Sequence, residues 1–239
     1  MIPIQILRVL STIRRFDVPA LLMGGQACVL YGAAEYSRDL DLAVLATEAA
    51  LPRFMEALQA LHATVIAVPS FELQYLTRGH AVHFSVPPDA DLGAVPPLRV
   101  DIMSHMRGVS PFDELWERRT TIALTNPSSQ DEILVDLMSL GDLVSAKKTQ
   151  RDKDWPMLRR LVDASYASAR DADTSEEQID FWLAELRSPE FLREAIARFP
   201  EHAAEMAADR VYWEPLRREL EALRYAARRS AGGDQSGTA

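Results

Sequence analysis

Asp39 and Asp41 lie two residues apart in a segment whose apolar residues are Leu40, Leu42 and Val44. This alternation is typical of a β-strand with one buried face, so both carboxylates share the other face and repel each other. Such hard oxygen donors suit Mg²⁺ or Mn²⁺, which is often held by one or two carboxylates together with substrate phosphates. The alternative is a solvent-exposed strand edge, or a turn that carries two aspartates, with no bound ion.

A glycine pair, Gly24 and Gly25, follows the apolar run at 20–23 and precedes a second apolar segment at 26–31. The pattern predicts a buried strand that turns sharply into a helix. Because neither glycine carries a Cβ, the backbone N–H groups of such a turn can cradle a phosphate at the start of the helix. The alternative is a tight turn with no ligand.

Asp101 is an isolated acidic residue in the apolar strand pattern at 98–103. Val100 and Ile102 share one face of this strand, whereas Arg99 and Asp101 share the other. A carboxylate in such a strand is costly unless it is paired or coordinated, so it either pairs with Arg99 or binds a cation. If this strand lies beside the strand of Asp41, the carboxylates converge.

All the lysines of the chain lie within one short stretch, and an arginine lies among them. These four cations are Lys147, Lys148, Arg151 and Lys153. At the junction of two predicted helices they form a candidate site for triphosphate oxygens, because lysine acts as a point charge and arginine as a fork. The alternative is a solvated helix face whose cations pair with neighbouring aspartates.

The order of Gly24-Gly25, a helix and then Ser37-x-Asp39-x-Asp41 resembles the nucleotidyltransferase superfamily that includes DNA polymerase β. More narrowly, it is similar to the AbiEii-type nucleotidyltransferases, a group rich in bacterial toxin components. The resemblance implies a third carboxylate on a later strand, for which the chain offers Asp101. Gln26 departs from the pattern, since many members have Ser or Thr at that position.

AbiEii-type proteins also carry a Lys-x-x-x-Arg-x-Lys-Asp pattern after the catalytic domain, which the stretch from 147 to 154 matches. The resemblance therefore implies two sets of site residues. The catalytic and metal-binding set is Asp39, Asp41 and Asp101. The set that holds the nucleotide is Gly24, Gly25, Ser37, Lys147, Arg151, Lys153 and Asp154.

The activity that this resemblance implies is Mg²⁺-dependent (or Mn²⁺-dependent) transfer of a nucleoside monophosphate from a nucleoside triphosphate such as ATP to an acceptor hydroxyl. The implied acceptor is an RNA end, notably of tRNA, and the implied partner is an antitoxin protein. A hydroxyl on a protein or on an aminoglycoside-like small molecule is an alternative acceptor. A nucleotide-binding regulatory or interaction protein without turnover is an alternative of another class.

Composition restricts the class of protein further. With 239 residues, of which 48% are hydrophobic, the chain can bury a substantial core. We expect no membrane segment and a cytoplasmic location, because no apolar run approaches the roughly 18 residues that span a bilayer. The single cysteine, Cys28, excludes an internal disulfide, and the net charge of −9 argues against a protein that coats nucleic acid by charge alone.

The hydrophobic patterns predict an α+β fold, and the resemblance implies a nucleotidyltransferase-like mixed β-sheet flanked by helices and followed by an all-helical C-terminal domain. Strands are predicted at 20–23, 40–44, 64–68, 71–76, 81–86, 98–103 and 120–124. A capping-box pattern at 129–132 predicts that the chain is helical from residue 133 onward. We therefore expect a catalytic domain at 1–125, a helical domain at 126–229 that completes the nucleotide site, and a disordered tail at 230–239.

Overall fold

The computed structural model describes residues 3–34, 36–89, 95–125, 127, 131–148 and 154–233. The chain forms two compact units, Met1–Ala167 and Ser168–Ala239. The sequence had predicted a division after residue 125 instead. Residues 132–137 add a strand to the sheet of the first unit, so this unit extends beyond that point.

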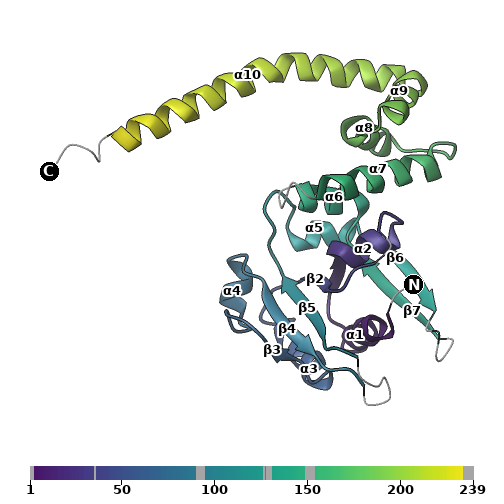
Figure 1. Cartoon of the computed structure of the whole chain (residues 1–239), viewed down its shortest axis with the longest axis vertical. Helices are drawn as coiled ribbons and strands as arrows, with labels where there is room; N and C mark the ends of the chain where they lie inside the picture. Colours follow the sequence, from purple (N-terminus) through teal and green to yellow (C-terminus); the bar gives the residue numbers. More distant parts are fainter. Residues whose placement is uncertain are drawn as a thin grey trace. The chain divides into compact units, whose positions relative to one another are not determined.

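Among the described residues, the first unit contains a seven-stranded mixed sheet in the order β3-β4-β5-β2-β1-β7-β6 (Figure 1). The strands are β1 Ala20–Met23, β2 Leu40–Val44, β3 Thr64–Val65, β4 Val82–Val86, β5 Leu98–Met103, β6 Thr120–Thr125 and β7 Glu132–Leu137. β2 runs antiparallel to β1 and parallel to β5, while β7 runs parallel to β1. The mixed α+β architecture expected from the sequence is therefore present.

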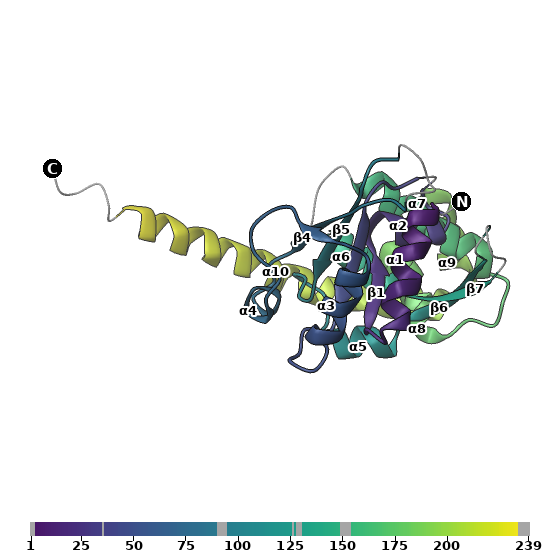
Figure 2. The same ribbon diagram turned by 90° about the horizontal axis from the view of Figure 1, so that it is seen from below.

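Helices flank this sheet. They are α1 Ile4–Arg15, α2 Gly24–Leu30, α3 Leu51–Ala60, α4 Leu73–Thr77, α5 Phe112–Glu117, α6 Leu140–Lys148 and α7 Trp155–Ala169. α1 and α3 contact each other and lie side by side over the sheet (Figure 2). α2 contacts β1, β2 and α6, which brings the residues after the glycine pair close to the later helical segment.

The core of the first unit follows the predicted alternation. Leu40, Leu42 and Val44 of β2 are buried, as are Val100 and Ile102 of β5. α1 forms because its apolar residues recur at helical spacing, and it turns that apolar stripe toward the sheet. The polar residues that alternate with these strand positions are consequently left on the partly exposed face.

Two predicted elements are wrong. Residues 71–76 were predicted as a strand, but residues 73–77 form the short helix α4. Residues 133–137 were predicted as helix, yet they form β7, which pairs with β6 along its whole length and with β1. Ile133, Val135 and Leu137 alternate with Leu134 and Asp136, so the segment also has the period of a strand, and pairing in the sheet satisfies its backbone.

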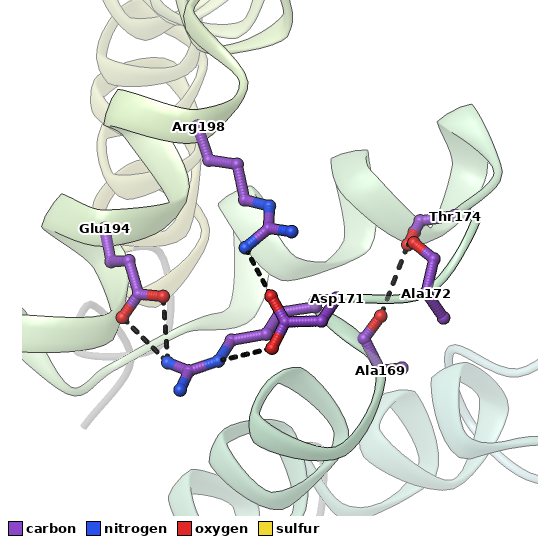
Figure 3. Close-up of polar contacts among 7 residues, drawn as sticks. Ala169, Asp171, Ala172, Thr174, Glu194 and Arg198 are labelled. Atoms are coloured by element: carbon purple, nitrogen blue, oxygen red, sulfur yellow. Dashed lines mark hydrogen bonds and ion pairs between the residues drawn. The ribbon is translucent and has the colours of Figure 1, made fainter.

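The second unit is helical, with α8 Glu176–Glu185, α9 Pro189–Arg198 and α10 Pro200–Gly233. Its core includes Trp182, which is fully buried. Ion pairs tie its first residues to α9, because Arg170 contacts both carboxylate oxygens of Glu194 at 2.8 and 2.9 Å while Arg198 contacts Asp171 at 2.9 Å (Figure 3). The predicted disordered tail at 230–239 starts inside α10, and its residues 234–239 lie outside the described part.

Within the described residues, no helix has the length and hydropathy of a membrane-spanning segment.

Candidate active site

Asp41 and Asp101 form the centre of the candidate site. β2 and β5 are parallel neighbours, and Asp41 is the register partner of Asp101. Register partners on adjacent strands point to the same face of a sheet, so the two carboxylates lie side by side. Leu42, the next residue along β2, lines a cavity with α1, so Asp41 points to the sheet face opposite α1. The prediction that the strand of Asp101 lies beside that of Asp41 is confirmed.

Two basic side chains hold Asp101. Its Oδ1 atom accepts a hydrogen bond from Arg99 Nε at 2.8 Å and lies 2.8 Å from His83 Nδ1. His83 stands opposite Asp101 on the antiparallel strand β4, on the side away from β2. The alternative to cation binding, in which Asp101 pairs with Arg99, is therefore present in the structure, beside the neighbouring carboxylate of Asp41. Both contacts use one oxygen of Asp101, which fixes the orientation of this carboxylate.

The glycine pair lies directly against the carboxylate of Asp41. Gly24 begins α2 with a φ of +66°, a conformation that favours glycine. A Cβ at Gly24 would lie 1.9 Å from Asp41 Oδ2. The backbone N–H of Gly25 is 3.4 Å from the same oxygen, to which it donates a long hydrogen bond. The turn thus brings the start of a helix to a carboxylate and leaves no room for a side chain.

The side chain of Ser37 lies against Gly25, the second glycine of the pair. A Cβ at Gly25 would lie 2.3 Å from Ser37 Oγ, so this hydroxyl also depends on the missing side chain. Gln26 is 1% exposed, and its Nε2 atom donates a 2.7 Å hydrogen bond to the carbonyl of Ser37. The buried amide of Gln26 therefore anchors the segment that carries Ser37 and Asp39 against the start of α2.

Electrostatics sets Asp41 apart from an ordinary surface carboxylate. Burial raises the pKa of Asp41, and the neighbouring charge of Asp101 raises it further. The N–H of Gly25 and the charge of Lys147 act in the opposite direction, while Asp39 adds a smaller upward effect on this pKa. Two carboxylates in a partly buried site are therefore held together with incomplete compensation, which favours binding of a cation.

Lys147 is 8% exposed and lies near the C-terminal end of α6. Its charge is close enough to lower the pKa of Asp41 and to act on Cys28 of α2. A buried lysine is unusual unless it has a compensating partner, and these carboxylates supply one. The lysine stretch therefore begins at the candidate site and not on a solvated helix face.

Of the remaining residues predicted to hold the nucleotide, only Asp154 lies within the described part of the chain. Asp154, the half-buried residue before α7, is close enough to raise the pKa of Cys28 through its charge. Burial is the larger cause and brings that thiol pKa to about 11. Arg151 and Lys153 lie outside the described residues, so their assignment to the nucleotide site stays a prediction.

Asp39 differs from Asp41 in its exposure to solvent. It immediately precedes β2 and is exposed, while its charge still acts on Asp41 and Arg99. Within the described ranges, no group of three or more His, Cys, Asp or Glu side chains is arranged to hold a metal ion by itself. The Asp41–Asp101 pair nevertheless fits part of the shell of a hard divalent cation, whose remaining ligands would be phosphate oxygens and water.

His83 and the anchoring role of Gln26 are the site features that the sequence did not predict. His83 alternates with the buried Val82 and Phe84, so it lies on the polar face of β4, the second strand from one edge of the sheet. That alternation was a usable signal for its face. Its contact with Asp101 depended on the strand order, which period-two patterns do not encode.

Comparison with known proteins gives few matches. No protein-family model and no curated protein matches this sequence. Among solved structures, the chain is similar to an antigenic nucleotidyltransferase-like protein from Paracoccidioides brasiliensis, with 10% identity, a TM-score of 0.47, and coverage of 86% of this chain and 90% of the other.

It is also similar to the antibiotic-resistance factor ANT(2'')-Ia in its solution structure, with 12% identity, a TM-score of 0.35, and coverage of 91% and 95% of the two chains. A crystal structure of ANT(2")-Ia in complex with adenylyl-2"-tobramycin gives the same identity and TM-score, with coverage of 87% and 96%. Similarities of this strength do not assign an activity, so the function of this chain rests on its own residues.

Proposed function

We propose that this protein is a nucleotidyltransferase that moves a nucleoside monophosphate from a nucleoside triphosphate to an acceptor hydroxyl. The observation that carries the proposal is the juxtaposition of Asp41 and Asp101 on neighbouring strands, beside a glycine turn that admits no side chain. The buried Lys147, whose charge partly compensates these carboxylates, supports it. In such a reaction the α-phosphorus gains the acceptor oxygen and loses pyrophosphate.

We assign the residues as follows. Asp41 and Asp101, with Asp39 at the edge, would hold Mg²⁺ or Mn²⁺, and the turn at Gly24 and Gly25 with Ser37 would seat the triphosphate. The cation would supply electrostatic stabilisation of the entering and leaving oxygens. Arg99 and His83 keep Asp101 oriented. Lys147, and by expectation Arg151, Lys153 and Asp154, would complete the nucleotide side.

For the acceptor, the sequence resemblance to AbiEii-type proteins supports an RNA end, with tRNA as the first candidate. An antitoxin protein would then be the partner that restrains the activity. Hydroxyls on proteins or on aminoglycoside-like molecules are the other acceptors that the same chemistry would serve, because a cation held by the carboxylates would activate any suitably placed hydroxyl.

The test is transfer of label from each α-³²P nucleoside triphosphate in the presence of Mg²⁺. Parallel reactions contain total RNA, a protein lysate or an aminoglycoside, and pyrophosphate release is measured in each. We expect incorporation into RNA by the parent and none by Asp41→Asn. Label in protein or aminoglycoside would reassign the acceptor. Nucleotide binding with no pyrophosphate release in any reaction would reject the proposal in favour of a binding protein without turnover.

A further inference from the structure

The cavity that Leu42 lines with α1 lies at the opposite end of β1 from the glycine turn, and we call it the α1–β7 cavity. It has a volume of about 450 Å³, and its walls come from α1, the segment before β1, the end of α5, and the β6–β7 hairpin. Leu10, Ile13 and Leu42 supply apolar wall, while Trp116, Arg14 and Arg119 supply aromatic and charged groups. Pockets that bind small molecules have volumes of roughly 300–1,000 Å³, and this cavity falls within that range, with charged side chains beside its apolar wall.

Asp136 organises the polar side of this α1–β7 cavity. Its side chain is 12% exposed. Oδ1 accepts hydrogen bonds from Thr121 Oγ1 at 2.5 Å and from Arg119 Nε at 3.2 Å. Oδ2 lies 3.3 Å from Arg14 Nη1. Both oxygens of the Asp136 carboxylate thus already contact donors of the protein. A cationic ligand would therefore have to compete with Arg14 and Arg119 for this carboxylate.

Trp116 gives the cavity a fixed aromatic wall. The guanidinium of Arg119 lies 4.2 Å from the centre of the Trp116 ring, and Nη1 of the same arginine donates to the Trp116 carbonyl at 2.6 Å. Phe112, one helical turn earlier, stacks on Trp116 with ring centres 5.7 Å apart. Because Arg119 and Phe112 hold the half-buried ring, Trp116 is a rigid part of the wall and loses little freedom when a ligand packs against its remaining surface.

Arg14 is the cation with unused binding capacity. Its side chain is 49% exposed, and among the described residues it makes only the single 3.3 Å contact with Asp136. The other acidic residue of the lining, Asp17, is already paired with Arg53 at 2.8 Å. The lining thus holds two arginines and two aspartates, and because Asp17 is paired with Arg53 outside the lining, Arg14 and Arg119 share the single carboxylate of Asp136.

We infer that the α1–β7 cavity binds a small organic anion with a flat apolar body, whose anionic group contacts Arg14 and whose body packs against Trp116 and Ile13. The inference does not depend on the proposed transferase activity. β1 spans four residues, or ~13 Å, between this cavity and the glycine turn. Leu42 faces the cavity while Asp41 faces the other side of the sheet, so the two sites are separate.

The experiment is a fluorescence titration of the full chain with 1-anilinonaphthalene-8-sulfonate, a probe that has this chemistry. Arg14→Gln should weaken its binding about tenfold or more, because a charge-assisted contact is lost. Arg15→Gln is the matched control, since Arg15 is the next residue of α1, is exposed, and does not line the cavity. Equal affinity in the two variants would overturn the inference.

A second comparison uses only the parent protein and so does not depend on how the variants fold. Uncharged 1-anilinonaphthalene should bind the parent about tenfold more weakly than the sulfonate, since it lacks the group that contacts Arg14. Trp116→Leu should weaken both probes, because the aromatic wall is lost. Equal binding of the two probes to the parent, or no effect of Trp116→Leu, would show that the probes bind elsewhere and would overturn the inference.

Discussion

At the scale of single residues, Gly24 shows most directly how a missing side chain makes room for chemistry. It combines a positive φ with a Cβ position only 1.9 Å from Asp41 Oδ2, whereas Gly32 also has a positive φ, of +77°, but no atom within 4 Å of its Cβ position. Gly32→Ala should therefore destabilise the fold only through its backbone, by about 1–2 kcal/mol.

Gly24→Ala should cost roughly 1–3 kcal/mol more than Gly32→Ala, because the carboxylate of Asp41 must also move. Urea denaturation measures both losses, and titration with a non-hydrolysable triphosphate at fixed Mg²⁺ should show weakened binding only in Gly24→Ala. Similar losses of stability and unchanged nucleotide affinity in both variants would show that Asp41 does not depend on the bare glycine.

The raised pKa of Asp41 gives a second prediction, for stability against pH. A carboxyl whose folded-state pKa lies above its ordinary value of 3.8 stabilises the fold below that value, and this contribution is lost as pH rises through the raised pKa. Asp41→Asn removes the charge that burial and Asp101 oppose. The variant should therefore unfold at a higher temperature than the parent at pH 7, and the difference should shrink toward pH 3.

Mg²⁺ makes the same comparison sharper. A cation that binds the folded parent raises its unfolding temperature, whereas Asp41→Asn should gain little. Asp39→Asn is the control for removal of an exposed carboxylate, and its effect on stability without metal should be small. If Asp41→Asn is less stable than the parent at pH 7 without metal, the carboxylate serves the fold and the proposed metal site loses its main support.

At the scale of elements, α6 matters because it carries Lys147 to the carboxylates. Lys147→Met keeps most of the buried stem and removes the charge, so nucleotide affinity should fall about 10- to 100-fold, equivalent to roughly 1.5–3 kcal/mol. Lys148→Met, a change at the adjacent half-buried lysine, is the control and should have a smaller effect.

Calorimetric titration of a non-hydrolysable triphosphate at fixed Mg²⁺ and salt measures both affinities. We prefer Met to Ala at position 147 because the structure buries this side chain, so Ala would also leave a cavity in the core. Equal affinities for the parent and Lys147→Met would remove α6 from the nucleotide site.

The elements also show how far sequence patterns reach. The strand at Leu40–Val44 lies where its alternation predicted it, and Trp155–Ala169 is helical, as expected for the chain after residue 133. The segment at 132–137 forms a strand and not the predicted helix. The capping residues before it favoured a helix, but the two neighbouring strands offered hydrogen-bond partners for its backbone. Local propensity is a weak force, so pairing within the sheet decided the outcome.

The same distinction applies to the candidate site. Period-two alternation placed Asp101 on the polar face of its strand, and the strand order then placed it beside Asp41. No local pattern could show that Gln26 contacts Ser37 or that His83 contacts Asp101, since these contacts join residues 11 and 18 positions apart on different elements. Chemistry carried by one strand was predictable, whereas the residues that orient it required the fold.

At the scale of the whole molecule, charge sets a limit on how an RNA acceptor could bind. The chain has a net charge of −9. Proteins that hold nucleic acid through an extended basic surface release many counterions, so their affinity falls steeply with salt. For this chain we expect contacts confined to the reacting end of the RNA, with few phosphates neutralised.

The last prediction follows from that limit. If RNA is the acceptor, the logarithm of its binding constant should fall with the logarithm of salt concentration with a slope of only about −1 to −3, since each neutralised phosphate of a single strand contributes about −0.7. Fluorescence anisotropy of a labelled acceptor RNA between low and physiological salt measures this slope. An RNA of the same length with a blocked 3′ hydroxyl is the control for contacts away from the chemistry. A slope of about −6 or steeper would show an extended basic surface on this acidic protein and would contradict the end-confined binding that the carboxylate site requires.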